Sequence, residues 1–179
     1  MKYYKKIIGK EIYLSPLNTE DVSVFCKWLN DKSITDNTGM SEIMTTPITE
    51  GAYLEENSKA GKYQFAIVKK ENDVLIGSCG FNEVDFIRQT GMIGLFIGEE
   101  ENRGKGYGRE VLNLLLEYGF HTLNLHNIWL RAFSHNERAI SLYRRVGFKE
   151  IGRRRESYFL NGKRYDDVYM DMLREEFEK

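Results

Sequence analysis

The spacing of hydrophobic residues divides the chain into a mainly helical first part and a longer second part rich in strands. Residues 11–15 alternate as a strand does, and Asn18 is placed to cap a helix that continues to about Asn30. Thr49 is placed to cap a second helix through about Ser58. Residues 31–46, between the two helices, are polar and rich in Ser and Thr, and we expect a loop there.

From Tyr63 onward the pattern is mainly that of strands. The expected strands are residues 64–69, 74–86, 91–99, 127–133, 148–159 and 164–173. The expected helices are residues 106–123 and 137–146, the second ended by Gly147. Tight turns are expected at 71–73 and at Asn161-Gly162, a strong hairpin signal. This order of elements predicts a mixed α/β sheet.

Length and composition are those of an ordinary globular protein. The chain has 179 residues, 41% of them hydrophobic and 30% charged, which fits a single domain spanning 1–179. No apolar run approaches the roughly 18 residues of a membrane span, and the first six residues contain no apolar signal region. Cys26 and Cys79 form no CxxC pair, and the three histidines lack helical i,i+4 spacing. We therefore expect a cytoplasmic protein with no metal and no membrane partner.

One segment carries recognisable chemistry, the glycine-rich stretch from Arg103 to Gly108 between a strand and a long helix. The first turn of a helix offers unpaired N–H groups and partial positive charge, and glycines let a ligand approach the backbone. The segment therefore suits a pyrophosphate. It is neither a Walker A loop, since Gly106 follows Lys105 where Ser or Thr is needed, nor a G-x-G-x-x-G fingerprint. The alternative is a glycine-rich turn with solvated charges.

The stretches 91–108 and 136–148 together resemble the GNAT superfamily of N-acetyltransferases. The loop pattern of that family is Arg or Gln, two residues, Gly, one residue, then Gly or Ala, and Arg103, Gly106 and Gly108 fill it. Its second element is filled by Asn136, Ala139, Leu142-Tyr143 and Gly147-Phe148. The resemblance is best over residues 63–173. The tail from Gly152 to Met170 is similar to ribosomal-protein N-terminal acetyltransferases and spermidine acetyltransferases, although residues 99–102 hold one more residue than the spermidine enzymes.

The resemblance implies a single-domain fold with a mixed, largely antiparallel sheet flanked by helices, and acetyl-CoA as the cosubstrate. It implies that the backbone around Phe96 and Ile97 pairs with the pantetheine like an added strand, and that the glycine-rich loop holds the pyrophosphate. Asn136 would hydrogen-bond to the cofactor, and its alternative role is to cap a helix. The cofactor-binding residues so implied are Phe96, Ile97, Arg103, Gly104, Lys105, Gly106, Tyr107, Gly108 and Asn136.

Direct attack of an amine on the thioester needs oxyanion stabilisation, a base and a proton for the departing thiolate. A backbone N–H near Ile97 is a candidate to face the carbonyl oxygen. The resemblance matches Tyr143 to the family's tyrosine near the sulfur, so Tyr143 is the candidate proton donor; its alternative role is that of a core aromatic. Glu99 is the first candidate base, Glu83 the second and His135 a weaker third. Ordinary surface carboxylates are an equal alternative for the two glutamates.

Charge is unevenly distributed along a chain whose formal net charge is −1. Residues 71–101 contain seven acids and one base, a net of −6, whereas residues 103–155 contain eleven bases and four acids, a net of +7. A basic part suits an anionic cofactor and an acidic part suits a cationic amine. The alternative is a chance segregation of solvated faces.

These observations predict an acetyl-CoA-dependent N-acetyltransferase. The expected acceptors are a peptide or protein N-terminal amine, a polyamine, and an amino sugar or aminoglycoside, in that order. The rivals are a non-catalytic acyl-CoA sensor, which would not need Tyr143, and an RNA-binding domain that would rest on Arg153-Arg154-Arg155 alone. We expect no direct nucleic-acid partner, and a homodimer is the default assembly.

Overall fold

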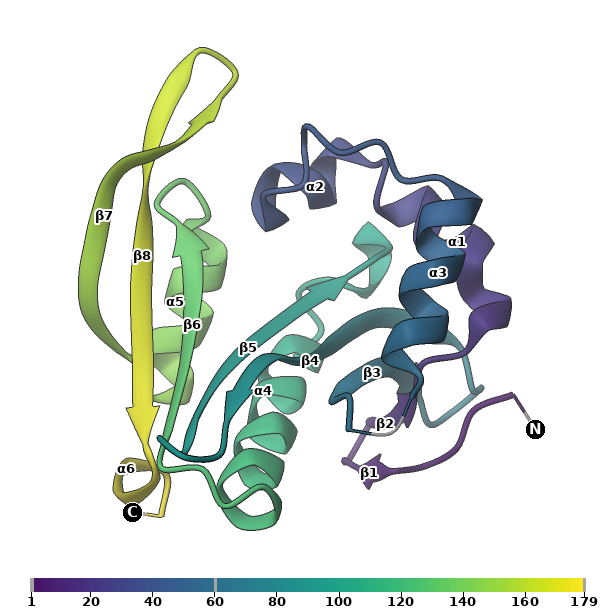
Figure 1. The fold of residues 1–179 in the computed structure, drawn as a ribbon, viewed down its shortest axis with the longest axis horizontal. Helices are drawn as coiled ribbons and strands as arrows, with labels where there is room; N and C mark the ends of the chain where they lie inside the picture. Colours follow the sequence, from purple (N-terminus) through teal and green to yellow (C-terminus); the bar gives the residue numbers. More distant parts are fainter. Residues whose placement is uncertain (1, 60, 179) are drawn as a thin grey trace. The chain divides into compact units, whose positions relative to one another are not determined.

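The computed structural model describes residues 2–59 and 61–178 (Figure 1). Its strands are β1 (Ile7–Ile8), β2 (Ile12–Pro16), β3 (Gln64–Lys69), β4 (Leu75–Asp85), β5 (Thr90–Ile97), β6 (Asn127–Phe133), β7 (Lys149–Leu160) and β8 (Lys163–Leu173). Its helical segments are η1 (Thr19–Asp21), α1 (Val22–Trp28), α2 (Lys32–Thr38), α3 (Pro47–Asn57), η2 (Glu100–Asn102), α4 (Tyr107–Glu117), η3 (Tyr118–Thr122), α5 (Glu137–Val146) and α6 (Arg174–Phe177).

Hydrogen-bonded neighbours in the sheet follow the order β1-β2-β3-β4-β5-β6-β8-β7. The described registers are antiparallel apart from the parallel pair of β5 and β6. This confirms the expected mixed, largely antiparallel sheet flanked by helices. The chain divides into two compact units, unit 1 comprising Met1–Phe81 and Leu95–Leu114, and unit 2 comprising Asn82–Gly94 and Leu115–Lys179.

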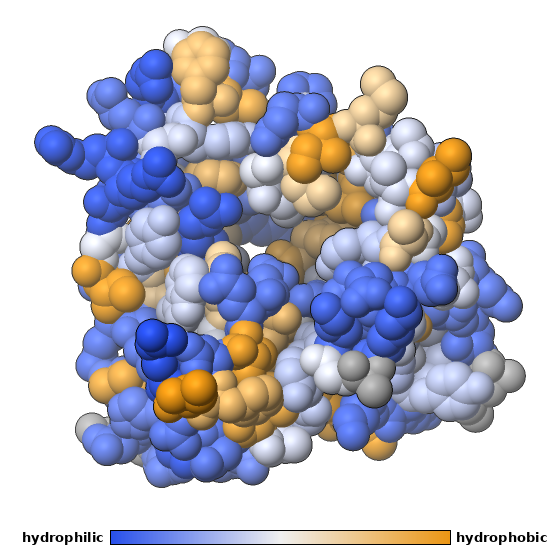
Figure 2. Space-filling model, in the orientation of Figure 1, coloured by the Kyte–Doolittle hydropathy of each residue, from blue (hydrophilic) through white to orange (hydrophobic). Residues whose placement is uncertain are grey.

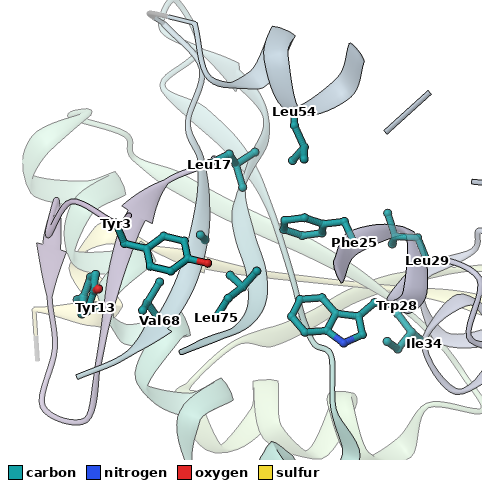
Figure 3. Packing of buried hydrophobic residues seen from close by; sticks show 11 residues of the cluster. Tyr3, Tyr13, Leu17, Phe25, Trp28, Leu29, Ile34, Leu54, Val68 and Leu75 are labelled. Carbon is teal, nitrogen blue, oxygen red and sulfur yellow. The ribbon is translucent and has the colours of Figure 1, made fainter. Parts of the chain in front are cut away.

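Unit 1 packs strands β2 to β4 against the first three helices. Its core cluster includes Phe25 and Trp28 of α1, Leu54 of α3 and Leu75 of β4, shown in Figure 3. The rings of Phe25 and Trp28 meet edge to face with centroids 5.7 Å apart. Both rings also lie edge-on to Phe96 of β5, with centroids 6.3 and 6.0 Å away, and so pack α1 against the sheet.

The helices of unit 1 differ from the sequence expectations in two places. Residues 31–46 are not a loop throughout, because α2 begins after Asp31, whose side chain accepts a hydrogen bond from Ser33 N at 2.8 Å, and ends at Gly39 with φ 75°. The second helix is capped by Thr46 rather than Thr49. Thr49 is the third residue of the helix, and the two threonines form a capping box in which the side chain of each accepts a hydrogen bond from the backbone N–H of the other. Pro47 occupies the first helical position, where its missing N–H costs nothing.

Unit 2 contains the β5–β6 parallel pair and the β7–β8 hairpin. The register of β5 with β6 runs over three pairs, from Thr90↔Asn127 to Met92↔Trp129. The predicted turn joins β7 to β8, with Asn161 at φ 49° and Gly162 at φ 79°. Helix α5 spans the predicted residues and ends at Gly147, φ 119°, where a Cβ would lie 3.0 Å from the Met172 side chain.

The helix expected over residues 106–123 has two parts. Helix α4 ends at Glu117, and the next turn, η3, is a π-helix. In unit 2 the Phe120 carbonyl accepts a short hydrogen bond from the Arg174 guanidinium, and Leu125 N donates to Gly119 O at 3.0 Å. The carbonyls of this last turn are thus bonded to groups outside the helix, as carbonyls at a helix C-terminus commonly are.

Candidate active site

The glycine-rich loop lies between η2 and α4, as the sequence predicts. Gly104 (φ 79°) and Gly106 (φ 92°) adopt left-handed backbone conformations that other residues rarely accept. The Gly106 carbonyl accepts hydrogen bonds from Arg109 N and Glu110 N, both at 3.1 Å, and so starts α4. The first N–H groups of α4 follow directly, and such groups have no partner within their own helix. The loop therefore has the geometry of an anion-binding helix terminus.

The carboxylate in the first turn of α4 is directed at the backbone of the β1–β2 connection. Glu110 Oε1 accepts hydrogen bonds from Glu11 N at 2.9 Å and from Ile12 N at 3.3 Å. A Cβ on Gly9 would lie 2.2 Å from the same oxygen, so a larger residue at this position would push the Glu110 carboxylate aside. Because the Glu110 carboxylate is bound to this connection, it does not occupy the N-terminus of α4. The partial positive charge of that helix end therefore faces the glycine-rich loop.

The Arg103 side chain is hydrogen-bonded within unit 1, and its expected contact with the cofactor stays a prediction. Its Nε donates to Ile97 O at 3.1 Å, and its Nη2 donates to Gly98 O at 2.6 Å and to Ser33 Oγ at 3.2 Å. One planar guanidinium thus ties the loop to the end of β5 and to the first turn of α2. The side chain positions the site, and the loop's N–H groups remain the contacts suited to an anion.

The end of β5 is held close to β4 by glycines. A Cβ on Gly77 would lie 2.1 Å from the Phe96 carbonyl oxygen, so the close approach of the two strands requires a glycine there. Gly98 N donates to Ile76 O at 2.9 Å, which continues the pairing beyond Ile97. The Phe96 ring packs edge-on against Trp28, with centroids 6.0 Å apart. Phe96 and Ile97 therefore belong to a rigid strand end.

Glu99 follows that strand and is already engaged. Its Oε1 accepts hydrogen bonds from Lys27 Nζ at 2.5 Å and from Trp28 Nε1 at 3.0 Å. The Lys27 and Trp28 hydrogen bonds lower the pKa of Glu99. A carboxylate with a lowered pKa is a weaker proton acceptor, so its role as general base stays a prediction.

Tyr143 lies on α5 in unit 2 and is 8% exposed. Its ring meets Phe148 edge-on with centroids 6.1 Å apart. Burial raises its pKa to about 12, so the phenol stays protonated across the physiological range. A buried phenol that keeps its proton meets the first requirement of an acid, and its contact with the sulfur atom stays a prediction.

Asn136 has the capping role that was its alternative assignment. Its side-chain oxygen accepts a hydrogen bond from Ala139 N at 3.1 Å, at the start of α5. The side-chain NH2 group does not take part in that bond, so capping is compatible with a hydrogen bond to a cofactor.

The two remaining base candidates lie in unit 2. Glu83 is an exposed residue of β4. His135 is surrounded by aromatic rings, and its ring centroid lies 4.6 Å from that of Tyr165. Neither is joined by a described contact to Tyr143.

Sequence reasoning missed the residues that support the site from a distance. Lys27 and Trp28 reach Glu99 across more than 70 positions, and Ser33 reaches Arg103 across 70. Asp31 belongs to the same group, since hydrogen bonds from Ser33, and then the charges of Arg103 and Lys27, lower its pKa. The available signal was the capping pattern Asp31-Lys32-Ser33, which places a helix start where we expected a loop.

Two negative findings concern the described residues. Among residues 2–59 and 61–178 the structure holds no group of three or more His, Cys, Asp or Glu residues that could bind a metal ion. Within the same ranges, no helix is long and apolar enough to cross a membrane.

The fold and the loop together define an acyl-CoA-dependent acyltransferase class. The family model described as "Acetyltransferase (GNAT) domain" matches residues 11–149. The chain belongs to the GNAT acetyltransferase family, and it is an acetyl-CoA-dependent N-acetyltransferase that transfers an acetyl group to an amine.

Individual relatives agree with this family. The N-acetyltransferase p20 of Bacillus licheniformis is 30% identical over 177 residues, which cover 94% of this chain and 96% of that protein. The spermidine N(1)-acetyltransferase of Vibrio cholerae is 37% identical over 102 residues, 57% of this chain and 58% of that protein. The crystal structure of the Vibrio cholerae spermidine N-acetyltransferase in complex with CoA and spermine matches 94% of this chain and 99% of that chain. Its TM-score is 0.81 and its identity 26%.

Proposed function

We propose that the chain acetylates a primary amine of an aliphatic polyamine. The observation that carries the proposal is the acidic segment from Ser33 to Ser58, which contains no Lys or Arg and, besides the buried Glu50, four acids that reach the surface: Asp36, Glu42, Glu55 and Glu56. Its first residue is hydrogen-bonded to Arg103, and Arg103 binds the end of β5. A cationic acceptor is attracted to such a segment. The similarity to spermidine N-acetyltransferases supports the same class of acceptor.

For the cofactor we propose two contacts. The N–H groups of the loop Arg103, Gly104, Lys105, Gly106, Tyr107 and Gly108 bind the pyrophosphate, and the exposed Lys105 adds a cation. The backbone of Phe96 and Ile97 pairs with the pantetheine as an added strand. The left-handed glycines and the rigid end of β5 support this assignment, and the free NH2 of Asn136 supplies a further donor.

For the chemistry we propose direct transfer. The neutral amine nitrogen attacks the thioester carbonyl carbon, a tetrahedral oxyanion forms, and the C–S bond then breaks to give the amide and a thiolate. The Tyr143 hydroxyl donates its proton to that thiolate, and the proton that the amine loses restores the phenol. The buried, protonated state of Tyr143 supports this role.

Glu99 we propose as the carboxylate that receives the incoming ammonium. Its pKa is lowered, so it stays charged and accepts hydrogen bonds from cations, as it already does from Lys27. An amine with a pKa near 10 is mostly protonated at pH 7, so it must lose a proton before it attacks, and we propose Glu99 as the base that takes this proton through a water molecule.

We propose further that residues 1–179 act as one functional domain, that the protein works in the cytoplasm, and that it forms a homodimer. The family model spanning residues 11–149, which include parts of both units, supports the first point. The prevalence of twofold homodimers supports the last.

A panel of acceptors tests the proposed function. Purified protein with saturating acetyl-CoA is offered spermidine, a peptide with a free N-terminus, and an aminoglycoside, and thiol release is measured. We expect kcat/KM for spermidine to exceed the other two values by at least tenfold. Equal or greater turnover of the peptide would overturn the polyamine assignment and favour the N-terminal acceptor.

A further inference from the structure

One face of the unit 2 sheet carries aromatic side chains around a buried carboxylate. The register places Asp167 of β8 opposite Phe133 of β6 and Arg154 of β7. Since alternate residues of a strand point to the same face, Tyr165 and Tyr169 share the face of Asp167.

Ring contacts confirm that these side chains lie together. Phe133 stacks on Tyr158 with centroids 3.8 Å apart, and Tyr165 lies 4.6 Å from the His135 ring. The loop that carries His135 is fixed, because Ser134 N donates to Asp166 O at 2.9 Å and Asp166 N donates to Ser134 Oγ at 3.0 Å. The aromatic face is therefore a rigid surface.

The carboxylate of Asp167 is incompletely paired. Asp167 is 2% exposed, and its Oδ2 lies 3.5 Å from Arg131 Nη1. Its Oδ1 is buried and has no hydrogen-bond partner in the described part of the chain. Leaving a buried carboxylate oxygen without a donor is unfavourable, so such an atom calls for a ligand that donates a hydrogen bond to it.

The His135 side chain on the same face also lacks hydrogen-bond partners. Both ring nitrogens are buried and make no hydrogen bond to any described residue. A neutral imidazole offers one acceptor nitrogen and one donor. Rings stacked around it exclude water from its sides, as the contacts to Phe133 and Tyr158 show.

We propose that this face of unit 2 binds a protonated organic amine through Asp167 and His135. One ammonium N–H donates to Asp167 Oδ1, a second donates to the acceptor nitrogen of His135, and the carbon chain lies against the aromatic rings. Arg131 is compatible with this ligand because it contacts the other carboxylate oxygen. An anionic ligand would meet Asp167 as a like charge.

The occupant we infer is a charged amine of a polyamine, and this identity rests on the proposed function. A polyamine carries several amines that are protonated at neutral pH, and any one of them supplies the N–H donors that Asp167 and His135 require.

The site is tested with n-butylamine, which is protonated at neutral pH and whose primary ammonium offers the two N–H donors that the site requires. The probe is titrated into the native protein without acetyl-CoA, and ¹H–¹⁵N NMR shifts are followed. We expect saturable shifts centred on residues 133–135 and 165–167. Shifts centred elsewhere, or none, would overturn the proposal.

Matched variants locate the interaction. Asp167→Asn keeps the shape of the side chain and removes its charge, and we expect the probe to bind at least tenfold more weakly. Asp171→Asn is the control, since Asp171 is on the same strand and is bound by Asn127 at 2.7 Å; its affinity should equal that of the native protein. His135→Phe, which keeps a ring and removes both nitrogens, gives a second variant if Asp167→Asn fails to fold. Unchanged affinity in either folded variant would contradict the proposal.

Failure of this site and failure of the proposed function give different results. Probe binding at this face with no acetylation of spermidine would support the site and overturn the polyamine as its occupant. Acetylation of spermidine with no probe binding would leave the proposed function intact and overturn the site.

Discussion

At the scale of single residues, a buried hydroxyl and a buried carboxyl carry the clearest consequences. Tyr143 is held protonated by burial, with a pKa of about 12. Glu50 on α3 is 5% exposed, and its Oε1 has no partner among the described residues. Desolvation raises the pKa of Glu50. Both side chains therefore favour their neutral forms. For Tyr143 this bears on the proposed catalysis, and for Glu50 it bears on the stability of the fold.

Tyr143→Phe should lower kcat by more than tenfold, because the leaving thiolate loses its proton donor. The ring and its packing against Phe148 are kept, so the Kd for acetyl-CoA should change by less than about twofold. Initial rates at saturating substrates and calorimetric titration measure the two quantities. Undiminished kcat would remove Tyr143 from the reaction.

Glu50→Gln should stabilise the protein at pH 8 and change little at pH 4. The folded-state pKa of Glu50 is raised, so its contribution to stability is present at low pH and is lost as pH rises through the folded pKa. Thermal unfolding midpoints across pH 4–8 measure the difference. Glu55→Gln, an exposed position on the same helix, is the control. A constant difference between native protein and Glu50→Gln at all pH values would refute this account.

The sequence predicted the residues of the glycine-rich loop but not the hydrogen bonds of Arg103. Glycines in left-handed conformations leave a local signal, because few other residues are tolerated there. The bonds from Arg103 to Ser33, and from Lys27 to Glu99, join residues far apart in the chain, and hydrophobic periodicity does not report such contacts. The same limit applies to Asp167 and His135.

At the scale of elements, long periodic segments were predicted well and short ones were not. The bounds of β3, β6 and α5 are those expected. Helix α2 was not predicted from the sequence. It has only seven residues, and its two buried positions, Ile34 and Thr35, are adjacent, so they give no helical hydrophobic period. Its evidence lies in the caps at Asp31 and Gly39. The π-helical turn after α4 was also not predicted, and its Phe120 carbonyl contacts Arg174, more than 50 positions later in the chain.

The attachment of α1 to the end of β5 depends on Gly98. A Cβ there would lie 2.1 Å from the Trp28 ring, so Gly98→Ala should destabilise the protein by about 1–3 kcal/mol through overpacking. Gly152→Ala in β7 is the control, because a Cβ there meets no atom within 4 Å. Urea unfolding of both variants measures the change. Equal stability of the two would show that Trp28 moves aside freely.

At the scale of the whole molecule, near-zero net charge conceals acidic and basic stretches. Hydrophobic residues on the face seen in Figure 2 lie in separate patches among hydrophilic ones. The acids from residues 71 to 101 and the bases from 103 to 155 adjoin at the glycine-rich loop in sequence. Different parts of one chain thus carry the charges that would suit an anionic cofactor and a cationic acceptor.

Acetyl-CoA should stabilise the whole protein against unfolding. A ligand present at 100 times its Kd adds about 2.7 kcal/mol to the folded state. The thermal midpoint should therefore rise with acetyl-CoA, and Gly106→Glu should abolish the rise, since it places a negative side chain in the loop. Gly152→Glu introduces the same side chain outside the loop and should retain the rise. Loss of the shift in both variants would argue against the loop as the pyrophosphate site.

The engagement of Glu110 with the β1–β2 connection has a consequence for turnover. A helix N-terminus that favours phosphates also attracts nearby carboxylates of its own chain. A carboxylate bound there competes with the cofactor, and each cofactor molecule has to displace it. Here the carboxylate of the first turn is held by Glu11 N and Ile12 N. Once CoA departs, the proposed anion site is free at once for the next acetyl-CoA, and reloading proceeds without a preceding rearrangement of α4.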